Sequence, residues 1–187
     1  MSEYFVKRKL QVDGMVQILH MLSADEIRKC LKLQPHPAEG GYFVETYRAE
    51  HVLAPDALPT GYPGARSVST AIYYLLTPDS FSAMHRLRGD EIFHFYLGDP
   101  VELLQIGPKG TGEVIVLGQD ILAGMRLQHV VPGGAWQGSR LRAGGKYALL
   151  ETTVAPGFDY QDFEIGERDE LTAEFPQFAK MILALTR

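Results

Sequence analysis

The sequence predicts an all-β domain, either a sandwich or a barrel, with short helices at its two ends. Eight strand-like segments follow one another between Ser67 and Val154, at intervals of about 8–12 residues. The turns between them draw on the chain's 19 glycines and 11 prolines. Helical patterns occur only before and after this region, so a core built on sheets is expected.

Composition narrows the class of protein. The 187 residues are 45% hydrophobic and 22% charged, which is ordinary for one globular domain. The net charge of −5 argues against a nucleic-acid partner. No apolar run approaches the ~18 residues of a membrane-spanning helix, and a single cysteine excludes an internal disulfide framework. We therefore expect a cytoplasmic protein with no membrane or nucleic-acid partner.

The chain is expected to begin with an N-terminal arm at residues 1–21, followed by one domain over residues 22–187. A capping box that starts at Ser23 predicts a short helix over Ser23–Lys32. Cys30 falls on the apolar face of this helix, where a packing role is expected.

The next segment contains a turn and the first strand of the domain. A Gly-Gly pair at Gly40 signals the turn, and alternation predicts a strand over Tyr42–Tyr47. His36 and Glu39 precede the pair and are interpreted as turn residues. Residues 54–65, rich in proline and glycine, form a loop long enough to cover part of the domain.

Alternation and the positions of glycine and proline place the other elements. The strands are expected at Ser67–Leu76, Phe81–Arg86, Glu91–Leu97, Val101–Ile106, Glu113–Leu117, Arg126–Val131, Ala135–Leu141 and Lys146–Val154. Two C-terminal helices are expected at Glu167–Phe175 and Pro176–Leu185, the second opened by its proline.

The stretch Phe81–Gly98 concentrates the candidate chemistry. Both faces of its second strand are largely apolar, which predicts burial on two sides. His85 and Glu91 enter this apolar setting together, and buried ionisable side chains are costly unless they are paired, ligated or used. A structural alternative stays open for each residue: a histidine that donates to a carbonyl group, and a glutamate paired with an arginine.

Two motifs resemble those of the cupin superfamily. His85 lies six residues before Glu91, and six residues separate Glu91 from Gly98, as in the first cupin motif H-x-H-x(3,4)-E-x(6)-G. Residues 132–137 read PGGAWQ and resemble the second motif, P-x-G-x-x-H. The chain also resembles one uncharacterised cupin-5 branch, a domain of unknown function, in HPAEGGYFVETYR at residues 36–48 and TVAPGFDYQDFEIG at residues 153–166.

The resemblance implies a double-stranded β-helix, the cupin jelly roll, over about residues 42–163. It also implies a pocket for a small-molecule ligand inside the barrel, and a homodimer.

The departures from the motifs bear on cofactors. Metal-binding cupins present two histidines and a glutamate in the first motif and a histidine in the second. Here Leu87 replaces the second histidine and Gln137 replaces the last one. A transition-metal site needs about three nitrogen or carboxylate ligands. No cofactor is therefore expected. If a divalent metal did bind, its ligands would be His85, Glu91 and Gln137.

Alternation within the implied jelly roll adds further candidates. Gln137 and Ser139 share a face and are expected to bind ligand oxygen atoms, with simple barrel hydrogen bonding as the open alternative. Tyr147 and Glu151 share another face, and would add a proton-donating phenol and a second carboxylate to the pocket. Arg86 lies near the mouth, where it would attract an anionic ligand.

Three functions stay open. The first is a metal-independent isomerase or epimerase acting on a small carbohydrate-like or sugar-nucleotide-like substrate. By analogy with deoxysugar-nucleotide epimerases of the same fold, His85 would be its base, Glu91 would orient that base, and Tyr147 would be the acid. The second is a non-catalytic binding module. The third, a metal-dependent dioxygenase or isomerase, is disfavoured by Leu87 and Gln137.

Overall fold

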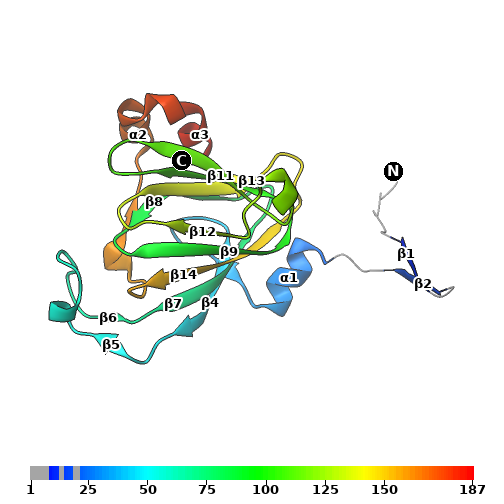
Figure 1. The fold of residues 1–187 in the computed structure, drawn as a ribbon, viewed down its shortest axis with the longest axis horizontal. Helices are drawn as coiled ribbons and strands as arrows, with labels where there is room; N and C mark the ends of the chain where they lie inside the picture. Colours follow the sequence, from blue (N-terminus) through cyan, green and yellow to red (C-terminus); the bar gives the residue numbers. More distant parts are fainter. Residues whose placement is uncertain (1–8, 13–14, 19–21) are drawn as a thin grey trace.

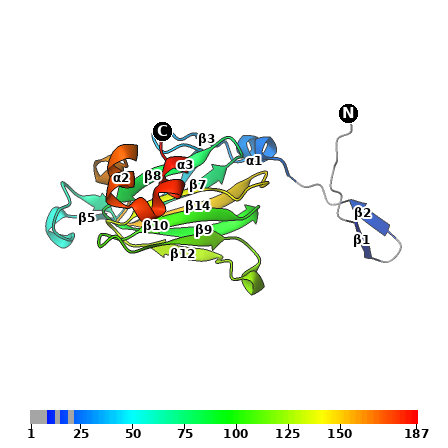
Figure 2. The ribbon, with the colours of Figure 1, turned by 90° about the horizontal axis from the view of Figure 1, so that it is seen from above.

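The body of this computed structural model is a sandwich of two antiparallel sheets (Figures 1 and 2), and the structure describes residues 9–12, 15–18 and 22–187. In spatial order, the six-stranded sheet contains β12 (Gln128–Val131), β9 (Asp90–Gly98), β14 (Ala148–Ala155), β7 (Thr70–Leu76), β4 (Tyr42–Arg48) and β3 (Gln34–Pro35). The five-stranded sheet contains β11 (Gly112–Leu117), β10 (Val101–Ile106), β13 (Trp136–Leu141), β8 (Phe81–Leu87) and β15 (Phe163–Ile165). The predicted all-β class is confirmed.

Several short elements complete the described chain. Two small strand pairs are β1 (Lys9–Val12) with β2 (Met15–Ile18), and β5 (Val52–Leu53) with β6 (Arg66–Ser67). The 3₁₀ helices are η1 (Pro55–Ala57), η2 (Ile121–Ala123), η3 (Tyr160–Asp162) and η4 (Pro176–Phe178). Apart from β1 and β2, the arm predicted at residues 1–21 lies outside the described residues. No helix in the described ranges is long and apolar enough to cross a membrane.

The strands follow the sequence prediction closely. Each of the eight predicted strands is present, although the one expected at Ser67–Leu76 is divided. Its first residue, Ser67, belongs to β6, which pairs with β5 and not with the large sheet. The strands β3, β5 and β15 were not predicted, because two or three residues are too few to show alternation.

The main core lies between the sheets, where apolar side chains from both inner faces meet. Residues that pair directly across two strands share a face of the sheet, and this pairing places Val101 and Leu103 of β10 opposite Leu141 and Ser139 of β13. The three apolar residues among them pack in one buried cluster with Phe93, Phe95, Tyr74 and Leu150 of the other sheet. This cluster holds the two sheets together.

The C-terminal helices cover the outer face of the five-stranded sheet (Figure 1). α2 (Arg168–Glu174) and α3 (Ala179–Ala184) bury Leu171 and Ile182 against Met84 and Trp136 of the sheet. Both predicted helices are therefore present. The second one begins as the 3₁₀ turn η4, with Pro176 at its start.

The N-terminal helix α1 (Ala24–Cys30) has the predicted capping box. The Glu26 amide donates to Ser23 Oγ at 3.2 Å, and the Ser23 amide donates to Glu26 Oε2 at 2.8 Å. Ile27 packs against Leu75 and Leu149 on the outer face of the six-stranded sheet. The expectation that Cys30 packs was wrong. The helix ends at this residue and buries only Ile27, which leaves the thiol exposed.

A bulge in β8 decides which of its side chains face the interior. Gln137 of β13 pairs with His85, but Ser139, only two residues further, pairs with Ser82. The extra residue on β8 places Ser82 and His85 on the same face, although an odd spacing in a regular strand would separate them. Both side chains therefore point into the space between the sheets.

A buried ion pair fixes the segment that follows β14. Arg66 donates to both carboxylate oxygens of Asp162, at 2.6 and 3.0 Å, and both side chains are almost fully buried. The half-exposed Arg88 approaches the same carboxylate at 3.3 Å. Because Asp162 closes η3, this pair anchors residues 158–163 to β6.

Candidate functional site

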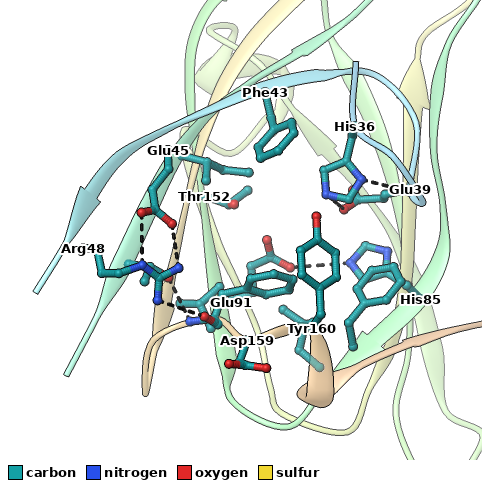
Figure 3. A pocket seen from close by; sticks show the side chains of 16 residues that line it. His36, Glu39, Phe43, Glu45, Arg48, His85, Glu91, Thr152, Asp159 and Tyr160 are labelled. Carbon is teal, nitrogen blue, oxygen red and sulfur yellow. Dashed lines mark hydrogen bonds and ion pairs between the residues drawn. The ribbon is translucent and has the colours of Figure 1, made fainter. Parts of the chain in front are cut away.

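A cavity of about 340 Å³ lies between the two sheets (Figure 3). Side chains of β4, β7, β8, β9 and β14 form its walls, together with residues 36–39 and the segment 158–163. Its size is within the range of ligand pockets in proteins, about 300–1,000 Å³.

His85 and Glu91 meet at the closed end of this cavity. His85 Nε2 lies 3.7 Å from Glu91 Oε2, and only 2% and 9% of the two side chains are exposed. His85 Nδ1 lies 2.8 Å from the Ala83 carbonyl oxygen, which can only accept, so Nδ1 carries a hydrogen. Gln137 Nε2 donates to Glu91 Oε2 at 2.6 Å. Both residues are thus fixed in orientation, with Nε2 directed at the carboxylate.

The surroundings of His85 favour its protonated form. Burial lowers the pKa of His85, but the negative charge of Glu39 and the hydrogen bond and charge of Glu91 outweigh it, and together they raise the pKa to about 9. At neutral pH the residue is therefore an imidazolium that faces a carboxylate. For the predicted role as a base, His85 would first have to lose this proton, because an imidazolium has no lone pair with which to take another.

A second histidine and glutamate lie beside the first pair (Figure 3). His36 Nε2 is 3.9 Å from Glu39 Oε2, and His36 Nδ1 accepts from the Glu39 amide at 2.9 Å. Burial lowers the pKa of His36, so its neutral form, with the hydrogen on Nε2, prevails at neutral pH. Glu39 Oε1 accepts a short hydrogen bond from Ser82 Oγ, which the bulge in β8 turns inward.

Gly40 brings this second pair close to β8. Its φ of +103° lies in the left-handed region, and a Cβ atom there would come within 2.4 Å of the Phe81 carbonyl oxygen. The Gly40 carbonyl also accepts from the buried Tyr74 hydroxyl at 2.6 Å. Only glycine allows the segment 36–39 to lie this close to the sheet.

Aromatic rings and charged groups line the outer part of the cavity. The rings are those of Phe43, Phe158, Tyr160 and Phe163. Phe163 stacks on His85 with 5.2 Å between ring centroids, and Phe43 meets His36 edge-on at 4.7 Å. Arg48 donates to both oxygens of Glu45, at 3.0 and 2.6 Å, and Figure 3 shows Asp159 beside it.

Two predicted catalytic or binding residues lie outside the cavity. Tyr147 packs against the cluster under α1, on the outer face of the six-stranded sheet. Glu151 pairs across the sheet with His94, and accepts a short hydrogen bond from Tyr96 on the same outer face. Their placement in the pocket was wrong. Alternation grouped them correctly with each other, but it does not say which face of a strand is the inner one.

The position of Arg86 also differs from the prediction. Arg86 points away from the cavity, where it pairs with Glu164 at 2.8 Å and lies 4.5 Å from the Trp136 ring centroid. It borders a separate hollow, which shares only Leu87 and Phe163 with the cavity wall.

Ser139 and Gln137 face the interior, as predicted, but neither lines the cavity. Among the buried side chains that the structure describes, Gln137 Oε1 and Ser139 Oγ have no hydrogen-bond partner. Gln137 reaches the cavity through the hydrogen bond that it donates to Glu91.

The sequence prediction missed the second pair and the aromatic wall. His36 and Glu39 do form the expected turn contact, which concealed that their side chains also reach the cavity. The signal available was two ionisable residues placed directly before a Gly-Gly pair. The aromatic and acidic alternation of residues 158–163 was visible too, but nothing local connects it with His85.

The protonation of His85 predicts a dependence of stability on pH. The pKa is raised from 6.5 to about 9 on folding, so the folded state binds this proton more tightly than the unfolded chain. The resulting stabilisation is complete below about pH 6.5 and is lost as pH rises through about 9, by about 3 kcal/mol in total. Urea unfolding gives the free energy of unfolding of the parent and of His85→Gln. The difference between the two should therefore fall by this amount as the pH rises from about 6 to about 10. A constant difference from about pH 6 to about pH 10 would contradict the assignment.

A sandwich of two antiparallel sheets around an internal cavity is the architecture of a cupin. The chain belongs to the Cupin_5 (DUF985) family of the cupin superfamily, whose model matches residues 25–166. It is 35% identical over 143 residues to the uncharacterized protein YML079W of Saccharomyces cerevisiae. The match covers 71% of this chain and 71% of that protein.

Two solved structures have the same architecture. A hypothetical protein from Leishmania major has a TM-score of 0.79 at 35% identity, over 88% of this chain and 99% of that one. Protein SO0799 from Shewanella oneidensis has a TM-score of 0.79 at 34% identity, over 89% and 99%. The predicted family is thus confirmed.

The residues at the cupin metal position do not fit a tightly bound transition metal. Leu87 lines the cavity without a donor atom, and Gln137 turns its amide hydrogens toward Glu91. His85 and Glu91 alone are fewer than the three or so ligands such a site needs. Over the described ranges, no three His, Cys, Asp or Glu side chains converge as a metal site.

We therefore expect the purified untagged protein to carry well below one equivalent of transition metal in elemental analysis. One equivalent that is lost in His85→Ala would show that the donor set was misjudged.

Proposed function

We propose that this cupin is a metal-independent isomerase that moves a proton between two atoms of a small polar organic ligand. The observation that carries the proposal is the buried pair of an imidazolium and a carboxylate at the closed end of the cavity. Such a pair supplies an acid and a base side by side, as proton-transfer catalysis requires.

The contacts of the pair support one division of the two roles. Glu91 Oε2 holds both the Gln137 hydrogen bond and the approach of His85, which leaves Oε1 outside these contacts. Glu91 takes a proton from a carbon of the ligand, and His85 Nε2 gives its proton to a second ligand atom. The pair then consists of a protonated glutamate and a neutral histidine. One proton transfer between them across 3.7 Å, directly or through water, restores the starting state.

His36 and Glu39 support this chemistry from the side. The Nε2 hydrogen of neutral His36 is available to a ligand oxygen, and the carboxylate of Glu39 contributes to keeping His85 protonated. The aromatic rings exclude water from the reacting atoms, which strengthens these electrostatic interactions.

A non-catalytic binding module is the second candidate. It is favoured by the hydrogen bonds that already hold both members of the pair, from His85 to Ala83 and from Gln137 to Glu91, because residues held in this way also occur as structural pairs. The two candidates predict the same ligand pocket and differ only in turnover. The homodimer and the cytoplasmic location stay predictions.

A screen followed by an isotope measurement tests the proposal. Small polar metabolites are screened for a rise in the melting temperature, and each hit is incubated with the protein in heavy water. The isomerase predicts that deuterium enters a carbon position of at least one hit, as detected by mass spectrometry. Binding without exchange would leave the binding module, and no hit at all would contradict both candidates.

A further inference from the structure

The charges around the cavity have a negative balance. The carboxylates that line it are Glu39, Glu45, Glu91 and Asp159. The positive side chains are Arg48 and, in its protonated form, His85. Four negative charges against two positive ones leave a balance of −2, and a neutral His85 would make it more negative still. An anionic ligand would therefore enter against the field of the site.

Aromatic rings line the same cavity as these charges. Phe43 and Tyr160 extend into the same space in Figure 3, and the rings of Phe158 and Phe163 also line it. Phe158 meets Tyr160 at 5.1 Å between ring centroids, and Tyr160 lies 6.4 Å from Phe163. These three rings therefore form one continuous group. Aromatic faces attract cations through the ring quadrupole, most strongly where water is excluded.

The Arg48 guanidinium does not offset the negative charge of the cavity for a ligand. Its Nε and Nη2 donate to Glu45, and Nη1 donates to the Phe158 carbonyl at 3.3 Å. Asp159 lies within range of the same guanidinium and adds negative charge. An incoming group thus meets rings and carboxylates, whereas the Arg48 guanidinium is already paired with Glu45.

We infer that the ligand of this cavity carries a small organic cation, an ammonium or alkylammonium group. This group is held between the aromatic rings and the carboxylates of Glu45 and Asp159. The inference rests on the proposed function, since it places the cation by the rings of Phe43, Phe158 and Tyr160, and the reacting atoms beside His85 and Glu91. It disfavours the sugar-nucleotide-like substrate that the fold analogy implies, because a nucleotide diphosphate is an anion.

Three probes of matched shape and different charge test the inference. Choline is the cation, 3,3-dimethylbutan-1-ol is its uncharged carbon isostere, and 3,3-dimethylbutanoate is the anion. Calorimetric titration at low salt should give choline an affinity about tenfold higher than the alcohol, and no binding of the anion. An alcohol that binds as tightly as choline, or an anion that binds at all, overturns the inference.

Two variants on one strand separate cation binding from general effects on the fold. Phe43→Leu removes a ring from the cavity and should weaken choline about fivefold or more, while it changes the alcohol less. Tyr47→Leu removes an exposed ring of the same strand outside the cavity and should change neither. Equal losses for both probes in Phe43→Leu count against the cation.

The outcomes also separate this inference from the proposed function. Suppose that no probe binds, but a neutral metabolite raises the melting temperature in the screen. The cation inference is then wrong, and the isomerase proposal stands. If neither the probes nor the screen give binding, both are wrong.

Discussion

Replacing His85 with glutamine is expected to reduce deuterium exchange into the bound ligand by about 10²–10⁴-fold, the usual effect of losing a general acid or base. Glutamine keeps a polar side chain of similar length but cannot deliver a proton from a charged ring. The Glu91 carboxylate would keep its hydrogen bond from Gln137, so its position should change little. Exchange rates from mass spectrometry at saturating ligand measure the loss.

A histidine on the opposite face of the sheet provides the control. His94 lies on the outer face of β9, where Gln128 approaches its ring at 3.4 Å, and it does not line the cavity. His94→Gln should therefore exchange deuterium at the rate of the parent. If His85→Gln also retained the parent rate, the pair would be structural and the isomerase proposal would be wrong.

Changing Asp162 to asparagine should lower the free energy of unfolding by about 3–5 kcal/mol. The substitution preserves shape, but it leaves the Arg66 guanidinium buried with no opposing charge. Arg88 cannot compensate, because it is a second cation at the same position. Urea unfolding at neutral pH measures the loss, and a decrease below about 1 kcal/mol would contradict it.

An exposed pair of the same geometry serves as the comparison. Arg86 contacts both oxygens of Glu164 at 2.8 Å, but 40% and 55% of these two side chains are exposed. Water and salt screen such a pair, so Glu164→Gln should change stability by about 1 kcal/mol or less. The contrast attributes the effect at Asp162 to burial, because the hydrogen-bond geometry is alike in both.

The fold could be predicted from the sequence because its signals are local. Alternation, the capping box at Ser23 and the turn glycines each depend on a few neighbouring residues, and each was confirmed in the structure. The motif spacing brought His85 and Glu91 together, and the structure places them in the same cavity, one on each sheet, 3.7 Å apart.

The rest of the site depends on long-range packing, which local signals do not carry. Tyr147 was assigned to the interior although its part of the sheet lies under α1, because a period of two cannot distinguish the two faces. Tyr160 and His36 lie far apart in sequence, and only the folded chain brings their rings within 6.5 Å. The charge of Glu39, which raises the pKa of His85, likewise comes from another segment of the chain.

The order in which the chain folds follows from how the cavity is closed. Arg48 of β4 donates to the Phe158 carbonyl across 110 residues of chain, and this contact joins two of its walls. Contacts between residues so distant in sequence form slowly, because the entropy of closing a long loop is lost before the contact is made. The hairpins of the sandwich, such as β10 with β11, need only short loops and can form first. We therefore expect the binding site to be among the last parts of the molecule to be completed, so that ligand binding reports a fully folded chain.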